Sequence, residues 1–181
     1  MVPEAPLERN EAGGLYPVEE GWFVVNARDA RWFESGGLGF YAPFESRDAR
    51  FAQLGINLNV LRPGEPNCMY HGEDAQEGFL VLSGECLLVV EGRERPLRQW
   101  DFVHCPPWTE HVFVGAGQGP CLLLAVGSRQ RPAGQGIRYP ADETALKHGA
   151  GVERETSDPE EAYARFPPLT PVTCPEEFPG P

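Results

Sequence analysis

The sequence lacks the features that would place the protein in a membrane, on nucleic acid or outside the cell. No apolar run approaches the ~18 residues of a membrane-spanning helix, and no charged start with an apolar stretch marks a secretion signal. Fifteen basic and 27 acidic residues give a formal net charge of −12, without a basic cluster. We therefore expect a cytoplasmic protein that binds neither nucleic acid nor an anionic membrane.

Cysteine is present in a pattern that excludes two common frameworks. The five cysteines are an odd number and include no CxxC pair, which fits neither a secreted disulfide scaffold nor a zinc knuckle. Cys86, Cys105 and Cys121 lie in strand-like runs and are expected to be buried, reduced thiols. Cys68 lies close to His71, so a redox or ligand role stays open for it.

Long amphipathic helical patterns are missing between residues 20 and 128. Short runs rich in β-branched and aromatic residues recur there between turn signals, which predicts an all-β sandwich or barrel. The predicted strands are WFVVN (22–26), ARWFE (30–34), GFYAPF (39–44), QLGINLNVL (53–61), GFLVLSG (78–84), CLLVVEG (86–92), RPLR (95–98), DFVHC (101–105), HVFVGAG (111–117) and CLLLAVG (121–127).

The chain is long enough for one domain with appended segments. Residues 1–20 are polar and rich in turn formers, which predicts an arm before regular structure begins near Trp22. Residues 21–130 form the predicted barrel. Residues 131–181 form a Pro-rich extension with one or two short helices, within 142–148 and 158–166. Its last residues, from 166, are expected to wrap the domain or stay mobile, since so many prolines exclude a central strand.

Several predicted strands are apolar on both faces, including LVLSG, CLLVV and CLLLAV. Such strands are buried between sheets or covered by a partner, and the WFVV run could cover or extend a neighbouring sheet. We therefore expect a homodimer. In the 53–61 strand, Asn57 and Asn59 alternate with apolar residues, and periodicity alone leaves open whether these amides line a pocket or face solvent.

Metal-binding residue types gather in the segment from Tyr70 to Glu85. Residues two apart on a strand share a face, so His71 and Glu73 point the same way, and a hairpin would bring Glu77 beside them. His111, which opens a later strand, would supply a fourth ligand. Imidazole nitrogens and carboxylate oxygens both bind divalent ions, so the spacing predicts a metal site inside the barrel.

This spacing resembles the first motif of the cupin superfamily, HxHxxxE followed by six residues and Gly. His71, Glu73, Glu77 and Gly84 keep that spacing, although Glu73 stands where the second histidine is usual. The glycine that precedes the motif is represented by Gly64, one residue further away than usual.

The second cupin motif, PxGxxH followed by three residues and then Asn, is similar to the segment from Pro106 to Gly115. Pro106 and His111 match it, whereas Trp108 replaces Gly and Gly115 replaces Asn. The resemblance covers about residues 50–128. It implies a double-stranded β-helix, the jelly roll of single-domain, RmlC-like cupins, with short C-terminal helices added here.

The resemblance implies that His71, Glu77 and His111 bind a metal, with Glu73 as a fourth ligand. Two histidines and two carboxylates favour Mn or Fe, with Zn and Ni as further options. If Glu73 instead turns away, the remaining two-histidine, one-carboxylate face is that of non-haem Fe(II) oxygenases. The apolar lining of the adjoining pocket is expected to comprise Phe79, Val81 and Phe113.

Three functions compete on this basis. The first is a metal-dependent enzyme, above all an oxygenase, that acts on a small polar or aromatic molecule. The second is an isomerase or lyase of a sugar-like substrate, in which the metal polarises a carbonyl. The third is a non-catalytic cupin that binds a small ligand or uses the metal for stability. Fold resemblance alone does not separate them.

Overall fold

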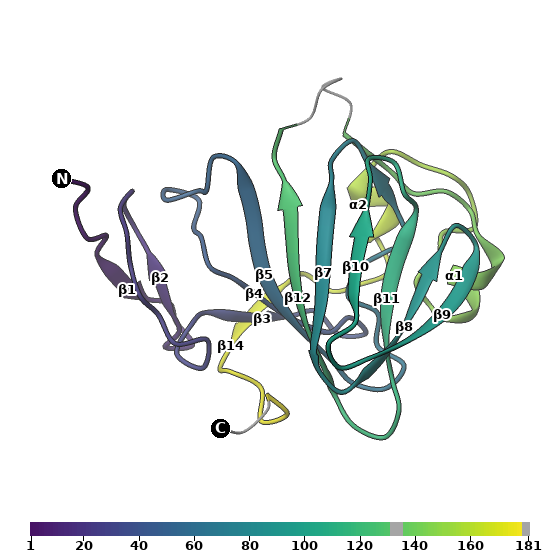
Figure 1. The fold of residues 1–181 in the computed structure, drawn as a ribbon, viewed down its shortest axis with the longest axis horizontal. Coiled ribbons are helices and arrows are strands. Elements are labelled where there is room, and N and C mark those ends of the chain that lie inside the picture. The colour runs from purple at the N-terminus through teal and green to yellow at the C-terminus, as the bar shows by residue number, and fades with distance from the viewer. Residues whose placement is uncertain (131–135, 179–181) are drawn as a thin grey trace.

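The computed structural model describes residues 1–130 and 136–178, and strands dominate this part of the chain (Figure 1). The strands are β1 (Leu7–Arg9), β2 (Leu15–Pro17), β3 (Trp32–Glu34), β4 (Phe40–Pro43), β5 (Leu54–Leu61), β6 (Gly72–Glu73), β7 (Glu77–Ser83), β8 (Glu85–Val90), β9 (Arg93–Arg98), β10 (Phe102–Cys105), β11 (His111–Ala116), β12 (Cys121–Ser128), β13 (Ile137–Arg138) and β14 (Thr170–Val172). The helices are α1 (Glu143–Lys147) and α2 (Pro159–Ala162). The all-β prediction with short C-terminal helices is confirmed.

Two sheets face each other and close around the core. The larger has the strand order β10-β7-β12-β5-β4-β3-β14, and the smaller has the order β11-β8-β9 (Figure 1). Apolar side chains from the inner faces of both sheets fill the space between them, because alternate residues of each strand point inward. The central cluster comprises Leu61, Phe79, Val81, Cys86, Leu88, Cys105, Phe113, Cys121, Leu123 and Ala125.

The N-terminal predictions need two corrections. Regular structure begins before Trp22, because β1 and β2 form an antiparallel hairpin in which Leu7 pairs with Pro17. The predicted strand at 22–26 is wrong. Its residues form no ladder beyond an isolated bridge between Glu4 and Trp22, and the side chain of Val24 is 80% exposed. A β-like composition does not produce a strand where no sheet edge is available.

The C-terminal extension packs on the barrel, although residues 131–135 and 179–181 lie outside the described part. Asp158 caps α2 by accepting a hydrogen bond from the amide of Glu160, and Pro159 occupies the first turn. This helix ends at Ala162, earlier than predicted. Strand β14 pairs with β3 at the edge of the larger sheet, where Pro171 is tolerated. The described helices are too short to form a membrane span.

The predicted hairpin that carries Glu73 and Glu77 is wrong in its pairing. Strand β6 pairs with β13 of the extension, with Glu73 opposite Ile137, whereas β7 pairs with β10 and β12. The turn between β6 and β7 therefore crosses from one sheet to another. Glu73 and Glu77, on the two sides of this turn, are therefore not partners in one β-ladder.

The register of β5 shows which face of the sheet carries Asn57 and Asn59. Both share the parity of Leu61, which lies in the core between the sheets, and Asn59 pairs with Leu123 of β12. Asn59 is 4% exposed, and its Nδ2 donates to Oδ1 of Asn57 at 2.8 Å. The two amides therefore lie inside the barrel.

Candidate metal centre

Three predicted ligands converge between the two sheets. One potential ligand atom from each of His71, Glu77 and His111 lies within 4.8 Å of the other two. Glu77 opens β7 and His111 opens β11, while His71 immediately precedes β6. Reciprocal backbone hydrogen bonds of 2.9 and 3.2 Å join His71 to His111 and bring their rings to a centroid separation of 5.0 Å. The barrel itself therefore assembles the group.

Backbone carbonyls fix the orientation of both imidazoles. Nδ1 of His71 lies 2.8 Å from the carbonyl oxygen of Met69, and Nδ1 of His111 lies 3.0 Å from that of Thr109. A carbonyl oxygen can only accept, so each Nδ1 carries the proton and the lone pair is on Nε2. This is the arrangement that orients metal-binding histidines.

Burial keeps the His111 imidazole uncharged at neutral pH. His71 is 9% exposed and His111 is 1% exposed, and burial together with the neighbouring His71 lowers the pKa of His111 to about 4. Nε2 of His111 lies 3.4 Å from a carboxylate oxygen of Glu77, whose side chain is 15% exposed. Two imidazoles and one carboxylate form a donor set that fits a divalent cation.

Glu73 lies beside this group without belonging to it. A Cβ atom placed on Gly127 would lie 3.6 Å from Oε1 of Glu77 and 3.9 Å from Oε1 of Glu73, so both carboxylates border the same space. The backbone of Glu73 is held by its pairing with β13 and by the amide of Trp108, which donates to the Glu73 carbonyl at 2.7 Å. Its role as a fourth ligand stays a prediction.

Cys68 is the thiol next to the candidate centre. Its Sγ lies 3.7 Å from Nδ1 of His71 and 3.4 Å from Oδ1 of Asn67. Burial raises the pKa of this thiol strongly, and the charges of Glu77 and Glu73 raise it further. Cys68 does not belong to the convergent group, and a redox or ligand role for it stays a hypothesis.

The other thiols and histidines have ordinary surroundings. All five cysteines are free of disulfides, and Cys86, Cys105 and Cys121 are buried, as predicted. His148 contacts Glu94 through Nε2 at 2.9 Å, away from the centre. His104 lies exposed on β10.

The predicted apolar lining lies against the centre as part of the core. Phe79 has its ring centroid 5.1 Å from that of His111 and 4.5 Å from that of Phe113, and Val81 is fully buried. These side chains exclude water from one flank of the group. That they also line a substrate pocket stays a prediction.

Sequence reasoning missed two tyrosines of the extension. Tyr139, which follows β13, is 3% exposed and has its ring centroid 6.1 Å from that of His71. Burial, with smaller contributions from Cys68 and Glu73, raises the pKa of Tyr139 to about 12. Tyr163, at the end of α2, packs edge-on against Tyr139. Both lie far from the ligand motif in sequence, and no local pattern marks them.

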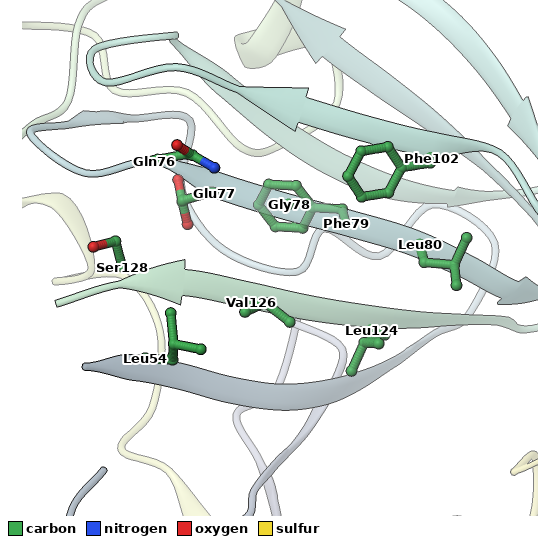
Figure 2. Close-up of a pocket in the computed structure, with 10 residues that line it drawn as sticks. All are labelled: Leu54, Gln76, Glu77, Gly78, Phe79, Leu80, Phe102, Leu124, Val126 and Ser128. Carbon is green, nitrogen blue, oxygen red and sulfur yellow. The ribbon is translucent and has the colours of Figure 1, made fainter. Parts of the chain in front are cut away.

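Among the hollows at the barrel, one is lined in part by Glu77 of the ligand group, and a larger one contains none of the three grouped ligands. The first, of about 360 Å³, lies on the outer face of the larger sheet and is bordered by Leu80, Phe102, Leu124 and Val126 (Figure 2). The other, of about 870 Å³, lies between β3–β4 and the extension and is lined in part by Tyr163.

Comparison with known proteins identifies the barrel. Residues 57–127 match the family model described as Cupin domain. This range includes all three residues of the ligand group, the strands from β6 to β11 and most of β5 and β12. This part of the chain is a cupin domain. The cupin domain supplies the His/Glu/His group, while β13, α1 and α2 lie beyond the matched range.

Solved structures agree on the cupin fold. An RmlC-like cupin from Shewanella frigidimarina is 17% identical, with a TM-score of 0.52 over 62% of this chain and 96% of that one. The polyketide cyclase RemF from Streptomyces resistomycificus is also 17% identical, with a TM-score of 0.52 over 61% and 82%. At these identities the likeness concerns the fold alone.

A third solved structure is more distant in shape. It is a protein from Acidithiobacillus ferrooxidans provisionally named a sugar phosphate isomerase, 23% identical with a TM-score of 0.42. The alignment covers 57% of this chain and 65% of that chain, slightly less than two thirds of its length. No curated protein sequence matches this chain.

The departures from the cupin motifs have local structural consequences. Trp108, in place of the motif glycine, has φ of +70°, a left-handed conformation that costs most residues about 1–2 kcal/mol. The Arg138 guanidinium lies over its ring, 5.7 Å from the ring centroid. Gly115, in place of the motif asparagine, has no room for a side chain, because its Cβ would lie 2.1 Å from the Arg62 carbonyl oxygen.

Proposed function

We propose that this cupin is a metal-dependent enzyme that acts on a small molecule, with a three-residue ligand face made by His71, Glu77 and His111. The observation that carries the proposal is the convergence of their ligand atoms within 4.8 Å, with both Nδ1 protons held by carbonyl oxygens. Such a face leaves further coordination positions for substrate or water.

A non-haem oxygenase is the reaction class we favour. Two histidines and one carboxylate are the ligand set of non-haem Fe(II) oxygenases, and the bound ion would supply Lewis acidity and, as Fe(II), activation of O₂. Phe79 and Phe113 keep water from the flank of His111. We favour Fe or Mn as the metal, with Zn or Ni as alternatives.

An isomerase or lyase is the second candidate, and the position of Glu73 favours it. Its carboxylate borders the same space as Glu77 but is not one of the three grouped ligands, a position suited to moving a proton on a bound substrate. The Tyr139 hydroxyl, on a side chain close to His71, keeps its proton at neutral pH and could donate it. This reaction needs no change in metal oxidation state.

The two reaction classes differ in whether turnover needs O₂ and a redox-active metal. Iron-loaded protein is offered a panel of small polar, aromatic and sugar-like compounds, and O₂ uptake and product formation are followed. An oxygenase consumes O₂ and is inactive with Zn or without air. An isomerase or lyase turns over with Zn under anaerobic conditions and loses activity in Glu73→Gln. Metal binding without turnover of any compound would favour a non-catalytic cupin.

The proposal also covers the location, oligomeric state and binding partners of the protein. We infer a cytoplasmic homodimer that binds a small molecule and neither nucleic acid nor a membrane, supported by the net charge of −12. The dimer contact we propose is the outer face of β10, β7 and β12, where Phe102 is 68% exposed beside the apolar hollow in Figure 2.

A further inference from the structure

The C-terminal extension holds the segment that carries His71 at several successive points. The amide of Met69 donates to the hydroxyl of Tyr163 at 3.0 Å, and the amide of Tyr70 donates to the carbonyl of Ala150 at 2.7 Å. Strand β6 then pairs with β13. The segment before and after His71 is therefore hydrogen-bonded to residues beyond the matched cupin domain.

One of these contacts is linked to the His71 imidazole through the backbone of a single residue, Met69. Tyr163 accepts the amide proton of Met69, and the carbonyl of the same Met69 accepts the Nδ1 proton of His71 at 2.8 Å. The position of the residue 69 backbone thus determines where the His71 ring points. Met69 is fully buried and packs with Tyr139 and Ala162, so water does not replace the phenol readily.

The second tyrosine supports the same ring from the side. The rings of Tyr139 and Tyr163 meet at 88° with centroids 5.9 Å apart, and the Tyr139 ring centroid lies 6.1 Å from that of His71. The Arg165 guanidinium donates to the sulfur of Met69 at 3.4 Å. Residues of α2 and its flanks therefore enclose residue 69 from several directions.

We propose that Tyr163 is a positioning residue of the metal centre, through which the C-terminal extension sets the orientation of His71. This inference rests on the proposed function, because it takes His71 as a metal ligand. Groups that orient metal-binding histidines typically change metal affinity 10–100-fold when they are removed. Tyr163 does not contact His71 directly but acts through the Met69 backbone. We therefore expect its removal to lower metal affinity about tenfold, at the lower end of that range.

The test compares Tyr163→Phe with wild type and with Asp142→Ala. The phenylalanine keeps the ring packing and removes the hydroxyl that accepts the Met69 proton. Asp142→Ala removes the cap of α1, whose Oδ1 accepts from Ala145 at 2.7 Å, and so destabilises the extension without touching residue 69. Metal-free full-length proteins are titrated with Co²⁺ by calorimetry, the Co²⁺ absorption spectrum is recorded at saturation, and melting temperatures are measured in parallel.

Weaker Co²⁺ binding and an altered Co²⁺ spectrum in Tyr163→Phe, with wild-type values in Asp142→Ala, support the inference. Wild-type affinity in Tyr163→Phe overturns it and leaves the proposed metal site intact. An equal loss of affinity in both variants also overturns it, because the effect is then one of stability. Absence of Co²⁺ binding in wild type overturns the proposed function and this inference with it.

Discussion

At the scale of single residues, spacing predicted the ligand group but not its surroundings. His71, Glu77 and His111 were expected together because their separations match strand geometry and the cupin motifs, and they do converge. Tyr139 and Tyr163 could not be expected, because a tyrosine in a Pro-rich extension has no local pattern that signals a contact with a distant histidine. Such contacts depend on tertiary packing rather than on periodicity.

The motif glycines act through the backbone and not through chemistry at the centre. Gly84 has φ of +74°, and a Cβ there would lie 2.2 Å from the carbonyl oxygen of Pro120. Both effects exclude a side chain, since real Cβ atoms essentially never approach backbone so closely.

Gly84→Ala is therefore expected to lower the free energy of unfolding by about 2–3 kcal/mol, through backbone strain and displacement of the Pro120 carbonyl. Urea unfolding followed by circular dichroism measures this change. Gly119→Ala is the matched control, because no atom lies within 4 Å of its Cβ position and its φ is not in the left-handed range. Equal stability of the two variants would contradict the account of the motif glycine.

At the scale of elements, the strands β3 to β5 and β7 to β12 were predictable, whereas β6 and the pairing partners of the strands were not. Composition and turn signals mark each strand locally. The run at 22–26 has the same composition and forms no strand, while β14 forms despite Pro171 because the edge of β3 is open to it. Pairing of β6 with β13 likewise depends on the extension folding back.

The cap of α1 gives an element-scale prediction. Asp142 accepts from the amide of Ala145, and Ala145 is fully buried against Tyr70 and Val112. Asp142→Ala should lower the free energy of unfolding by about 1 kcal/mol, the usual cost of losing an N-cap. Chemical denaturation checks this value. Glu153→Ala, at an exposed position, serves as control, and a cap variant as stable as that control would contradict the prediction.

At the scale of the whole molecule, the outer face of the larger sheet is unevenly covered. Trp32 packs with Phe178 over the β4–β5 end of this face. Towards β10 the face is apolar and open, with Leu124 and Val126 beside the exposed ring of Phe102 (Figure 2). In a chain of net charge −12, an apolar face of this kind is where two copies can meet without opposing like charges.

Phe102→Glu is expected to convert a dimer to a monomer, because it places two carboxylates in the symmetric contact. Light scattering coupled to size-exclusion chromatography at micromolar concentration measures the mass. Trp100→Glu is the matched control: Trp100 is 67% exposed, yet it does not border the hollow, so this variant should remain dimeric. A monomeric wild type, or a dimeric Phe102→Glu, would contradict the proposed interface.

The metal content of purified protein is the most direct evidence for or against the three-ligand metal face. Elemental analysis compares wild type, Glu77→Gln and Glu73→Gln, each purified without added metal or chelator. We expect nearly one Fe or Mn per chain in wild type and in Glu73→Gln, and loss of the metal in Glu77→Gln, because Glu77 and not Glu73 belongs to the convergent group. Metal retained in Glu77→Gln, or no metal in wild type, would contradict the three-ligand face.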